Sequence, residues 1–246
     1  MKKIFIFGFP HSGTTILQTI FSHVDSVYSN NDESMKIDAK TIDKFEKTKK
    51  SDIVIKYPYY DDSWIESEEY GDYHKIFIMR NPYWLYSSLH RRAQLDFGKK
   101  PDAYNNKHWN DVSRAYVISP KHSIENWERV SKKWLEYRNN PVDKVYCIKY
   151  EDLFENNYQN LKDILDKIGL EYTDDIFDNT KYKNTYKNMR RVNCLHRYEH
   201  LKLRNKQINE PFKNMNLPKK ITLTDKQKAE VSKISTLKDM GYDIIE

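Results

Sequence analysis

Short apolar runs alternate along the chain with segments of helical spacing. Four runs have the length and continuous apolar character of buried strands: Lys3–Phe7, Ile53–Lys56, Lys75–Met79 and Val145–Ile148. Elsewhere apolar residues recur every three or four positions, which is typical of an amphipathic helix. The segments with this spacing are Thr14–His23, a stretch from Pro82 toward Phe97, Ser123–Tyr137 and Tyr158–Ile168, the last closed by Gly169 as a C-cap.

Strands that alternate with helices predict an α/β fold, a three-layer sandwich with a central parallel sheet flanked by helices. The 246 residues fit a single domain, so we expect one unit over residues 1–246. Residues 98–120 contain Gly98, Pro101 and several Asn and indicate a long loop. Residues 180–220 are basic and have little pattern.

Composition narrows the class of ligand. Apolar residues make up 38% of the chain, with 19 Tyr, 10 Phe and 5 Trp, which is enough for a sizeable core. The formal charge of +6 suits an anionic ligand, but it is too small to indicate nucleic acid, and we expect no nucleic-acid partner.

The two cysteines, Cys147 and Cys194, are isolated, so we interpret them as free thiols of a cytoplasmic protein.

The first residues favour a strand over a targeting segment. Lys2 and Lys3 precede an apolar run as in a signal peptide, but the run ends at Gly8 and Pro10. No apolar stretch approaches the roughly 20 residues of a membrane span. We therefore expect a soluble protein without a membrane span. The sequence makes no prediction of its oligomeric state.

The strongest local signal lies between the first strand and the first helix. Residues from Gly8 to Thr15 have the spacing G-x-x-x-x-G and place glycines and backbone N–H groups at a helix N-terminus, where phosphates bind. The lysine of the loop G-x-x-x-x-G-K-S/T is missing, because Thr14 takes its position. A kinase needs that lysine on the β- and γ-phosphates, so a ligand with one phosphate at this point is indicated. An ordinary turn that caps the helix is the alternative.

A second signal follows the strand Lys75–Met79. The strand delivers Arg80 to its carboxyl end, where ligands bind in open α/β sheets, and Ser88 follows in the next helix. A guanidinium and a hydroxyl at this spacing can meet at one phosphate. Arg92 comes four residues after Ser88 on the same helical face and would add a cation. A strand-end salt bridge and a buried helix hydroxyl are the alternatives for Arg80 and Ser88.

The loop residues resemble a known family. They are similar to the loop P-K/R-S-G-T-T of sulfotransferases that use 3′-phosphoadenosine 5′-phosphosulfate (PAPS). The resemblance implies a P-loop-type domain in which the 5′-phosphosulfate is held by Pro10, His11, Ser12, Gly13, Thr14 and Thr15. His11 departs from the pattern, because the family usually has Lys or Arg there. A neutral His can donate one hydrogen bond to the leaving phosphate, and a protonated His is a stronger donor.

Two further elements extend the resemblance. Arg80, with Ser88, matches the family's R-D/N-P-x-x-x-x-x-S element, which binds the 3′-phosphate that distinguishes PAPS from ATP. Tyr150 opens a stretch similar to the family's Y-E-D-L element and is implied to lie near the adenine or its ribose. Glu151 and Asp152 are expected to brace the structure. The resemblance covers residues 3–17, 53–58, 75–92 and 145–170.

The resemblance also points to catalytic residues. Lys56 begins a K-x-P sequence like that of tyrosylprotein and related sulfotransferases, in which the Lys contacts the reacting group. Those enzymes place a catalytic Glu after the first helix. Counting from Pro10 without a gap selects Asp32 here, and one inserted residue selects Glu33, which we prefer for its reach. A solvated loop is the alternative, and rival bases are His90, His108 and His122.

The implied reaction is an in-line transfer with PAPS as co-substrate and adenosine 3′,5′-bisphosphate as product. Glu33 or Asp32 activates the acceptor, while Lys56, His11 and the loop N–H groups stabilise the leaving bisphosphate. No metal is required, and no Cys/His cluster has ligand spacing. Segments 98–140 and 176–246 would shape the acceptor site and cover the nucleotide. Arg190 would reach the 3′-phosphate with Lys187 and Arg191, and a basic solvated segment is the alternative for these three residues.

Two other functions remain open at this point. A nucleotide or small-molecule kinase is disfavoured by the missing loop lysine and by the lack of an apolar run that ends in an Asp for Mg²⁺. A non-catalytic nucleotide-binding protein of the same fold is kept open by His11 and by the open choice of base. The acceptor is not defined and could be a carbohydrate, a peptide tyrosine, a lipid or a small metabolite.

Overall fold

The computed structural model describes most of the chain, and it is continuous over the elements that carry the motifs. The described residues are 1–97, 123–182, 205, 209–212, 214, 221 and 223–245, and the side chains of residues 30–32 and 90–97 are not among them. The sequence-based expectations for the loop 98–120, His108, His122, Lys187, Arg190, Arg191 and Cys194 therefore lie outside the described residues.

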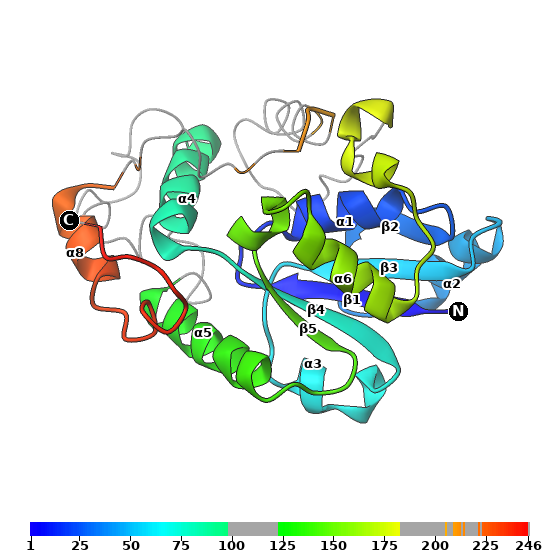
Figure 1. Cartoon of the computed structure of the whole chain (residues 1–246), viewed down its shortest axis with the longest axis horizontal. Coiled ribbons are helices and arrows are strands. Elements are labelled where there is room, and N and C mark those ends of the chain that lie inside the picture. Colours follow the sequence, from blue (N-terminus) through cyan, green and yellow to red (C-terminus); the bar gives the residue numbers. More distant parts are fainter. Residues whose placement is uncertain are drawn as a thin grey trace.

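A parallel five-stranded sheet forms the centre of the molecule, in the order β2-β3-β1-β4-β5 (Figure 1). Its strands are β1 Lys3–Gly8, β2 Val27–Glu33, β3 Asp52–Tyr57, β4 Tyr73–Met79 and β5 Val145–Lys149. β1, β3 and β4 are nearly continuous apolar runs, as expected of strands that are covered on both faces. The predicted α/β fold with a parallel sheet is confirmed.

Helices cover both faces of the sheet, which makes three layers (Figure 1). One face carries α1 Thr14–Ser22 and α6 Gln159–Ile168, and the other carries α3 Ser63–Glu66 and α5 Ile124–Asn139. α4 Pro82–Phe97 starts from the carboxyl end of β4. The remaining helices are α2 Ala39–Glu46, α8 Asp225–Val231 and the 3₁₀ segments Glu68–Tyr70, Glu151–Phe154, Asp174–Phe177 and Asn179–Lys181.

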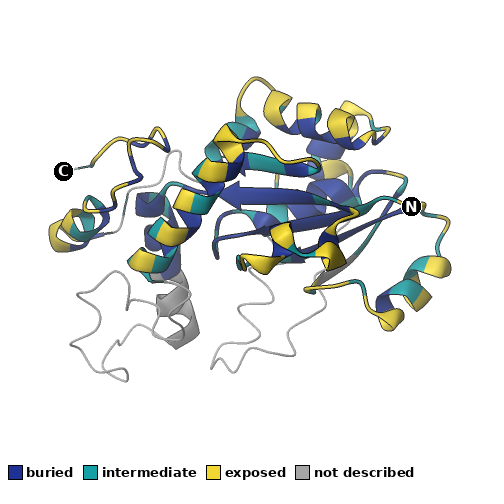
Figure 2. Ribbon diagram, turned by 90° about the horizontal axis from the view of Figure 1, so that it is seen from below, coloured by how far each residue is buried: buried dark blue, intermediate teal, exposed yellow. Residues whose placement is uncertain are grey.

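Two cores form because successive strand residues point to opposite faces. Toward α5 the core is aromatic and includes Phe5, Phe7, Phe77, Trp64, Trp127 and Trp134. Toward α1 and α6 it is largely aliphatic and includes Ile4, Ile6, Val54, Ile76 and Ile78. Figure 2 shows the buried strands between helices whose outer faces are exposed. The Trp134 indole N–H donates to the Phe77 carbonyl at 3.0 Å, which ties α5 to the sheet.

The register of the strands brings the motif residues to one edge of the sheet. Ile6 pairs with Lys56, and Gly8 pairs with Ile78, two residues before Arg80. On the other side of β3, Lys56 pairs with Glu33. The phosphate loop, Lys56, Glu33 and Arg80 thus all lie at the carboxyl ends of neighbouring strands, where parallel sheets bind ligands.

The expectation of four strands was incomplete. The sequence analysis placed Asp32 and Glu33 after the first helix without a strand, whereas both belong to the fifth strand, β2. β2 lies at the edge of the sheet, pairs only with β3 and ends in the polar residues of SNNDE, so it has no continuous apolar run. α2 and α8 were also missed, because both are short and largely polar. Within the described part of the chain no helix is long and apolar enough to cross a membrane.

Candidate active site

The loop after β1 is shaped by His11 and Gly13, which have left-handed backbone conformations, and by Gly8, which packs closely against β4. His11 has φ +66° and Gly13 has φ +105°, and Ser12 N donates to the Phe9 carbonyl at 3.1 Å between them. A Cβ on Gly8 would collide with the Ile78 carbonyl, and one on Gly13 would lie 2.5 Å from Cδ2 of Tyr150. The chain therefore lies tightly against β4 and Tyr150 before it enters α1. The first N–H groups of a helix have no partner within it, so this turn is built to receive an anion.

Two of the loop residues that carry hydroxyl groups are buried. Ser12 is 0% exposed. No group in the described part of the chain bonds to its Oγ. Thr14 is buried at the start of α1, and Thr15 is half-buried. A buried hydroxyl without a protein partner costs free energy, which a bound anion at the loop would offset.

Lys56 links the loop to the end of β2. Its side chain is 1% exposed, and Nζ donates to Thr15 Oγ1 at 2.9 Å. The same Nζ lies 4.0 Å from Oε1 of Glu33, whose side chain is 40% exposed. An ammonium is costly to bury without charged or polar partners, so this lysine is held where a hydroxyl and a carboxylate both face it. The arrangement places a cation and a solvent-accessible base beside the phosphate loop.

Arg80 closes the other side of the loop. It is 5% exposed, and Nη1 donates to the His11 carbonyl at 3.2 Å. Its guanidinium lies over the Tyr150 ring, 4.3 Å from the ring centroid. Burial lowers the pKa of Arg80, whereas Tyr150, Glu151 and Tyr242 act to raise it. An Arg remains protonated under such opposing influences, so the cation is permanent.

Glu151 braces the turn that follows Arg80. Its Oε1 accepts from the backbone N–H of Asn81 at 3.0 Å, and its Oε2 accepts from the Tyr242 hydroxyl at 3.1 Å. The Asn81 side chain in turn accepts from Tyr83 N at 3.0 Å at the start of α4. The expected bracing role of Glu151 fits these bonds. Tyr242 was missed, because its partner is 91 residues away and no local pattern signals the contact.

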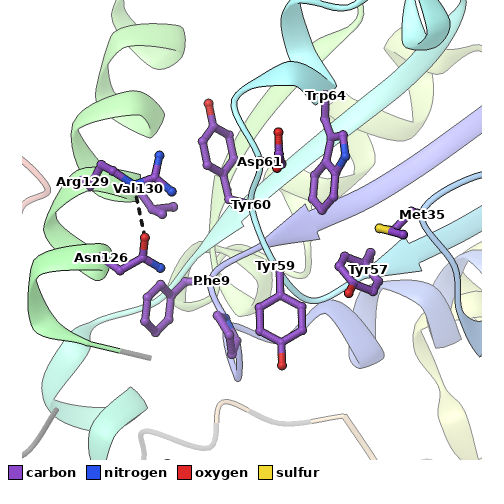
Figure 3. A pocket seen from close by; sticks show the side chains of 11 residues that line it. Phe9, Met35, Tyr57, Tyr59, Tyr60, Asp61, Trp64, Asn126, Arg129 and Val130 are labelled. Atoms are coloured by element: carbon purple, nitrogen blue, oxygen red, sulfur yellow. Dashed lines mark hydrogen bonds between the residues drawn. The ribbon is translucent and has the colours of Figure 1, made fainter. Parts of the chain in front are cut away.

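A cavity of about 260 Å³ opens beside the phosphate loop on the α5 side (Figure 3). Most of its walls are aromatic. Asn126 and Arg129 lie together on α5, and Asp61 lies between Tyr60 and Trp64. The full lining is Phe9, Pro10, Met35, Tyr57, Tyr59, Tyr60, Asp61, Trp64, Asn126, Arg129 and Val130. The sequence analysis missed this cavity, although the aromatic residues that follow Lys56 were an available signal.

The charges at the cavity largely compensate each other. Arg129 Nε donates to Asn126 Oδ1 at 3.2 Å, and Nη1 pairs with Asp62 Oδ2 at 2.9 Å. Asp61 Oδ1 accepts from the backbone N–H of Ser63 at 3.0 Å and from its hydroxyl at 2.7 Å. The cavity therefore offers aromatic surfaces and hydrogen-bonding groups without a strong excess of one charge.

For several other predicted residues the structure describes the backbone position but not the contacts of the side chain. Ser88 lies half-buried on α4, in the turn before Arg92. Asp32 lies on β2 and both His90 and Arg92 lie on α4, but their side chains are outside the described part of the structure. Tyr150 is buried between Gly13 and Arg80. Its implied place near the adenine or ribose stays a prediction.

Fold and site together define a P-loop-type α/β protein in which a buried lysine and a buried arginine flank an anion loop that lacks the kinase lysine. The chain belongs to the sulfotransferase domain family, whose sequence model matches residues 1–238. The family match gives no support to the kinase alternative. A search of curated proteins gives no significant match.

Three solved structures are similar to this chain, and the first of them shares its fold. A sulfotransferase from Alicyclobacillus acidocaldarius is 12% identical, with a TM-score of 0.51 over 94% of this chain and 96% of that one. The sulfotransferase domain of the curacin biosynthetic pathway is 14% identical, with a TM-score of 0.48 over 100% and 99% of the two chains. Mouse sulfotransferase SULT7A1, complexed with PAP, is 18% identical, with a TM-score of 0.48 over 71% of this chain and 61% of that one. The chain thus spans about three fifths of the mouse enzyme.

Proposed function

We propose that the chain transfers a sulfuryl group from PAPS to a hydroxyl or amine acceptor by in-line displacement. The observation that carries the proposal is the position of the Lys56 ammonium, buried between Thr15 at 2.9 Å and Glu33 at 4.0 Å. A phosphate loop, a fixed cation and a base meet there without the lysine that a nucleoside triphosphate requires.

In the proposed reaction the acceptor oxygen or nitrogen attacks sulfur as Glu33 takes its proton, with Asp32 as the alternative base. The bond between sulfur and the bridging oxygen breaks, and the electron pair leaves with adenosine 3′,5′-bisphosphate. Lys56, the loop N–H groups and the His11 side chain stabilise the charge that develops on the 5′-phosphate. His11 lies within the loop itself, in a left-handed backbone conformation.

The opposite end of the nucleotide is assigned to Arg80, with Ser88, Arg92 and Arg190 as further ligands of the 3′-phosphate. Arg80 contacts the phosphate loop through the His11 carbonyl, so one ligand can be held at both ends by adjoining groups. No step of this reaction requires a metal.

The aromatic cavity is proposed as the acceptor site. Pro10 belongs to the phosphate loop and Met35 follows Glu33 by two residues, so the cavity adjoins both the donor and the base. Flat aromatic walls, with an amide and a guanidinium on α5 and a carboxylate between Tyr60 and Trp64, suit a ring-sized acceptor that carries hydroxyl groups. We further propose a cytoplasmic location, which the free thiol of Cys147 supports.

Two measurements test the proposal. In a thermal-shift titration, adenosine 3′,5′-bisphosphate should raise the melting temperature and ATP with Mg²⁺ should not. Transfer of ³⁵S from labelled PAPS into an acceptor panel should then give a labelled product. The departure at His11 favours one second candidate, a binding protein without activity. Nucleotide binding without transfer would support that candidate, and no binding of the bisphosphate would exclude both.

A further inference from the structure

The segment after α8 returns to the carboxyl edge of the sheet and buries a tyrosine there. Gly241 N donates to the Lys238 carbonyl at 2.8 Å, and Tyr242 N donates to the Leu237 carbonyl at 2.9 Å, so the segment closes its own turn. Gly241 has φ +72°, a conformation that glycine adopts without strain. Tyr242 is 6% exposed. The family sequence match ends at residue 238, so this tyrosine lies beyond the part that the family model covers.

Tyr242 connects this segment to the backbone beside Arg80. Its hydroxyl donates to Oε2 of Glu151 at 3.1 Å, and Oε1 of the same carboxylate accepts from Asn81 N at 3.0 Å. Asn81 is the residue that follows Arg80. One carboxylate therefore joins the C-terminal segment to the turn that carries the buried guanidinium.

A second contact fixes the segment from the other side. Lys149 Nζ donates to the Met240 carbonyl at 3.5 Å, lies 3.4 Å from Asp152 Oδ1 and lies 5.6 Å from the centroid of the Tyr242 ring. Burial, followed by the Glu151 charge, raises the pKa of Tyr242 well above its ordinary value. The phenol therefore remains protonated and keeps donating to Glu151 at every pH at which the enzyme would be assayed.

We propose that Tyr242 is a positioning residue for the nucleotide. It holds Glu151, and through Glu151 the Arg80–Asn81 turn, in the arrangement from which Arg80 binds the 3′-phosphate. This inference rests on the proposed function, because it takes the anion at Arg80 to be that phosphate. Docking of the C-terminal segment is then a condition for tight binding of nucleotides that carry a 3′-phosphate.

The chain offers a matched control for this role. Tyr83 is also buried, and its hydroxyl bonds to Ser232 Oγ at 2.9 Å and accepts from Ile245 N at 3.3 Å. Tyr83→Phe removes a buried hydroxyl that ties the same segment to α4 through different partners. A loss of stability common to both positions can thus be separated from an effect that passes through Glu151.

The experiment compares calorimetric binding of adenosine 3′,5′-bisphosphate and adenosine 5′-monophosphate to the full chain. Tyr242→Phe should weaken the bisphosphate about 10-fold, the range of a residue that positions a ligand group, and leave the monophosphate within about twofold. Tyr83→Phe should leave the ratio of the two affinities unchanged. Because Tyr242 acts through Glu151, the effects of Tyr242→Phe and Glu151→Gln should be non-additive in the double variant.

Three results would overturn the inference: equal weakening of both nucleotides by Tyr242→Phe, the same change of ratio in Tyr83→Phe, or additive effects in the double variant. Arg80→Ala separates this failure from that of the proposed function. If the wild-type protein prefers the bisphosphate and Arg80→Ala removes the preference, the proposed function stands whatever Tyr242→Phe does. If the wild-type protein has no preference, both fail.

Discussion

Lys56 combines features that separate a functional lysine from a structural one. It lies near the carboxyl end of an interior strand, is almost completely buried, and faces a threonine of the phosphate loop and the carboxylate of Glu33. A lysine that only filled space there would bury a charge without need, since an apolar residue of similar volume packs at lower cost. This difference in cost supports the proposed role of the Lys56 charge in the reaction.

We expect Lys56→Met to lower kcat about 100- to 1,000-fold, because it removes a preorganised cation from the leaving group. The Kd for adenosine 3′,5′-bisphosphate should change far less. Lys75→Met is the matched control, because Lys75 is a buried lysine on β4 whose side chain points to the aromatic face of the sheet, away from α1. Equal losses of kcat in both variants would show that Lys56 acts only through the fold.

We prefer Glu33 over Asp32 as the base because Glu33 is the residue that pairs with Lys56, and its Oε1 lies 4.0 Å from Lys56 Nζ. We expect Glu33→Gln to lower kcat about 100- to 10,000-fold with little effect on bisphosphate binding, as for loss of a general base. Asp32→Asn should retain most of the activity. The reverse pattern in steady-state assays would assign the base to Asp32.

At the scale of elements, the turn from β1 into α1 depends on one close contact. Gly13 has φ +105°, and a Cβ there would lie 2.5 Å from Cδ2 of Tyr150, the ring that also supports Arg80. A side chain at this position would have to displace the ring or the loop. Both displacements would separate the two ends of the proposed nucleotide site.

Gly13→Ala should therefore abolish measurable binding of adenosine 3′,5′-bisphosphate and destabilise the protein by about 3 kcal/mol, the sum of a left-handed backbone and a steric clash. Gly169→Ala isolates the cost of the left-handed backbone conformation. Gly169 has φ +75°, but its added Cβ would lie 3.8 Å from the Lys2 side chain. It should cost about 1–2 kcal/mol in urea unfolding and leave binding intact. Intact binding in Gly13→Ala would contradict the proposed fit of the loop.

Local pattern identified some elements and not others for a physical reason. β1, β3, β4 and β5 are short apolar runs, so the pattern of apolar residues alone predicts each of them. β2 ends in the polar residues SNNDE, so no apolar run marks it, and α8 depends on a capping box at Thr224 and on contacts with distant segments.

The same distinction applies to the site. The loop, Lys56 and Arg80 could be predicted, because in a parallel sheet the end of every strand reaches the same edge. The aromatic cavity and the bond between Tyr242 and Glu151 join segments far apart in the sequence, and only the packed structure brings them together.

At the scale of the whole molecule, one sheet separates an aromatic core from a mainly aliphatic core. We expect the two cores to depend on each other, because β1, β3, β4 and β5 each contribute side chains to both. Trp64, Trp127 and Trp134 all lie in the aromatic core, so tryptophan fluorescence reports mainly on the α5 face. Far-UV circular dichroism reports on the backbone of every layer.

We propose that residues 1–246 unfold as a single cooperative unit, and urea unfolding tests this directly. The fluorescence and circular dichroism curves should coincide, since loss of either core exposes the sheet that both share. Adenosine 3′,5′-bisphosphate at about 100 times its Kd should stabilise the folded state by about 2.7 kcal/mol and shift both curves equally. Separate transitions, or a ligand shift confined to one probe, would show instead that the two faces of the sheet unfold independently and that the nucleotide stabilises only one of them.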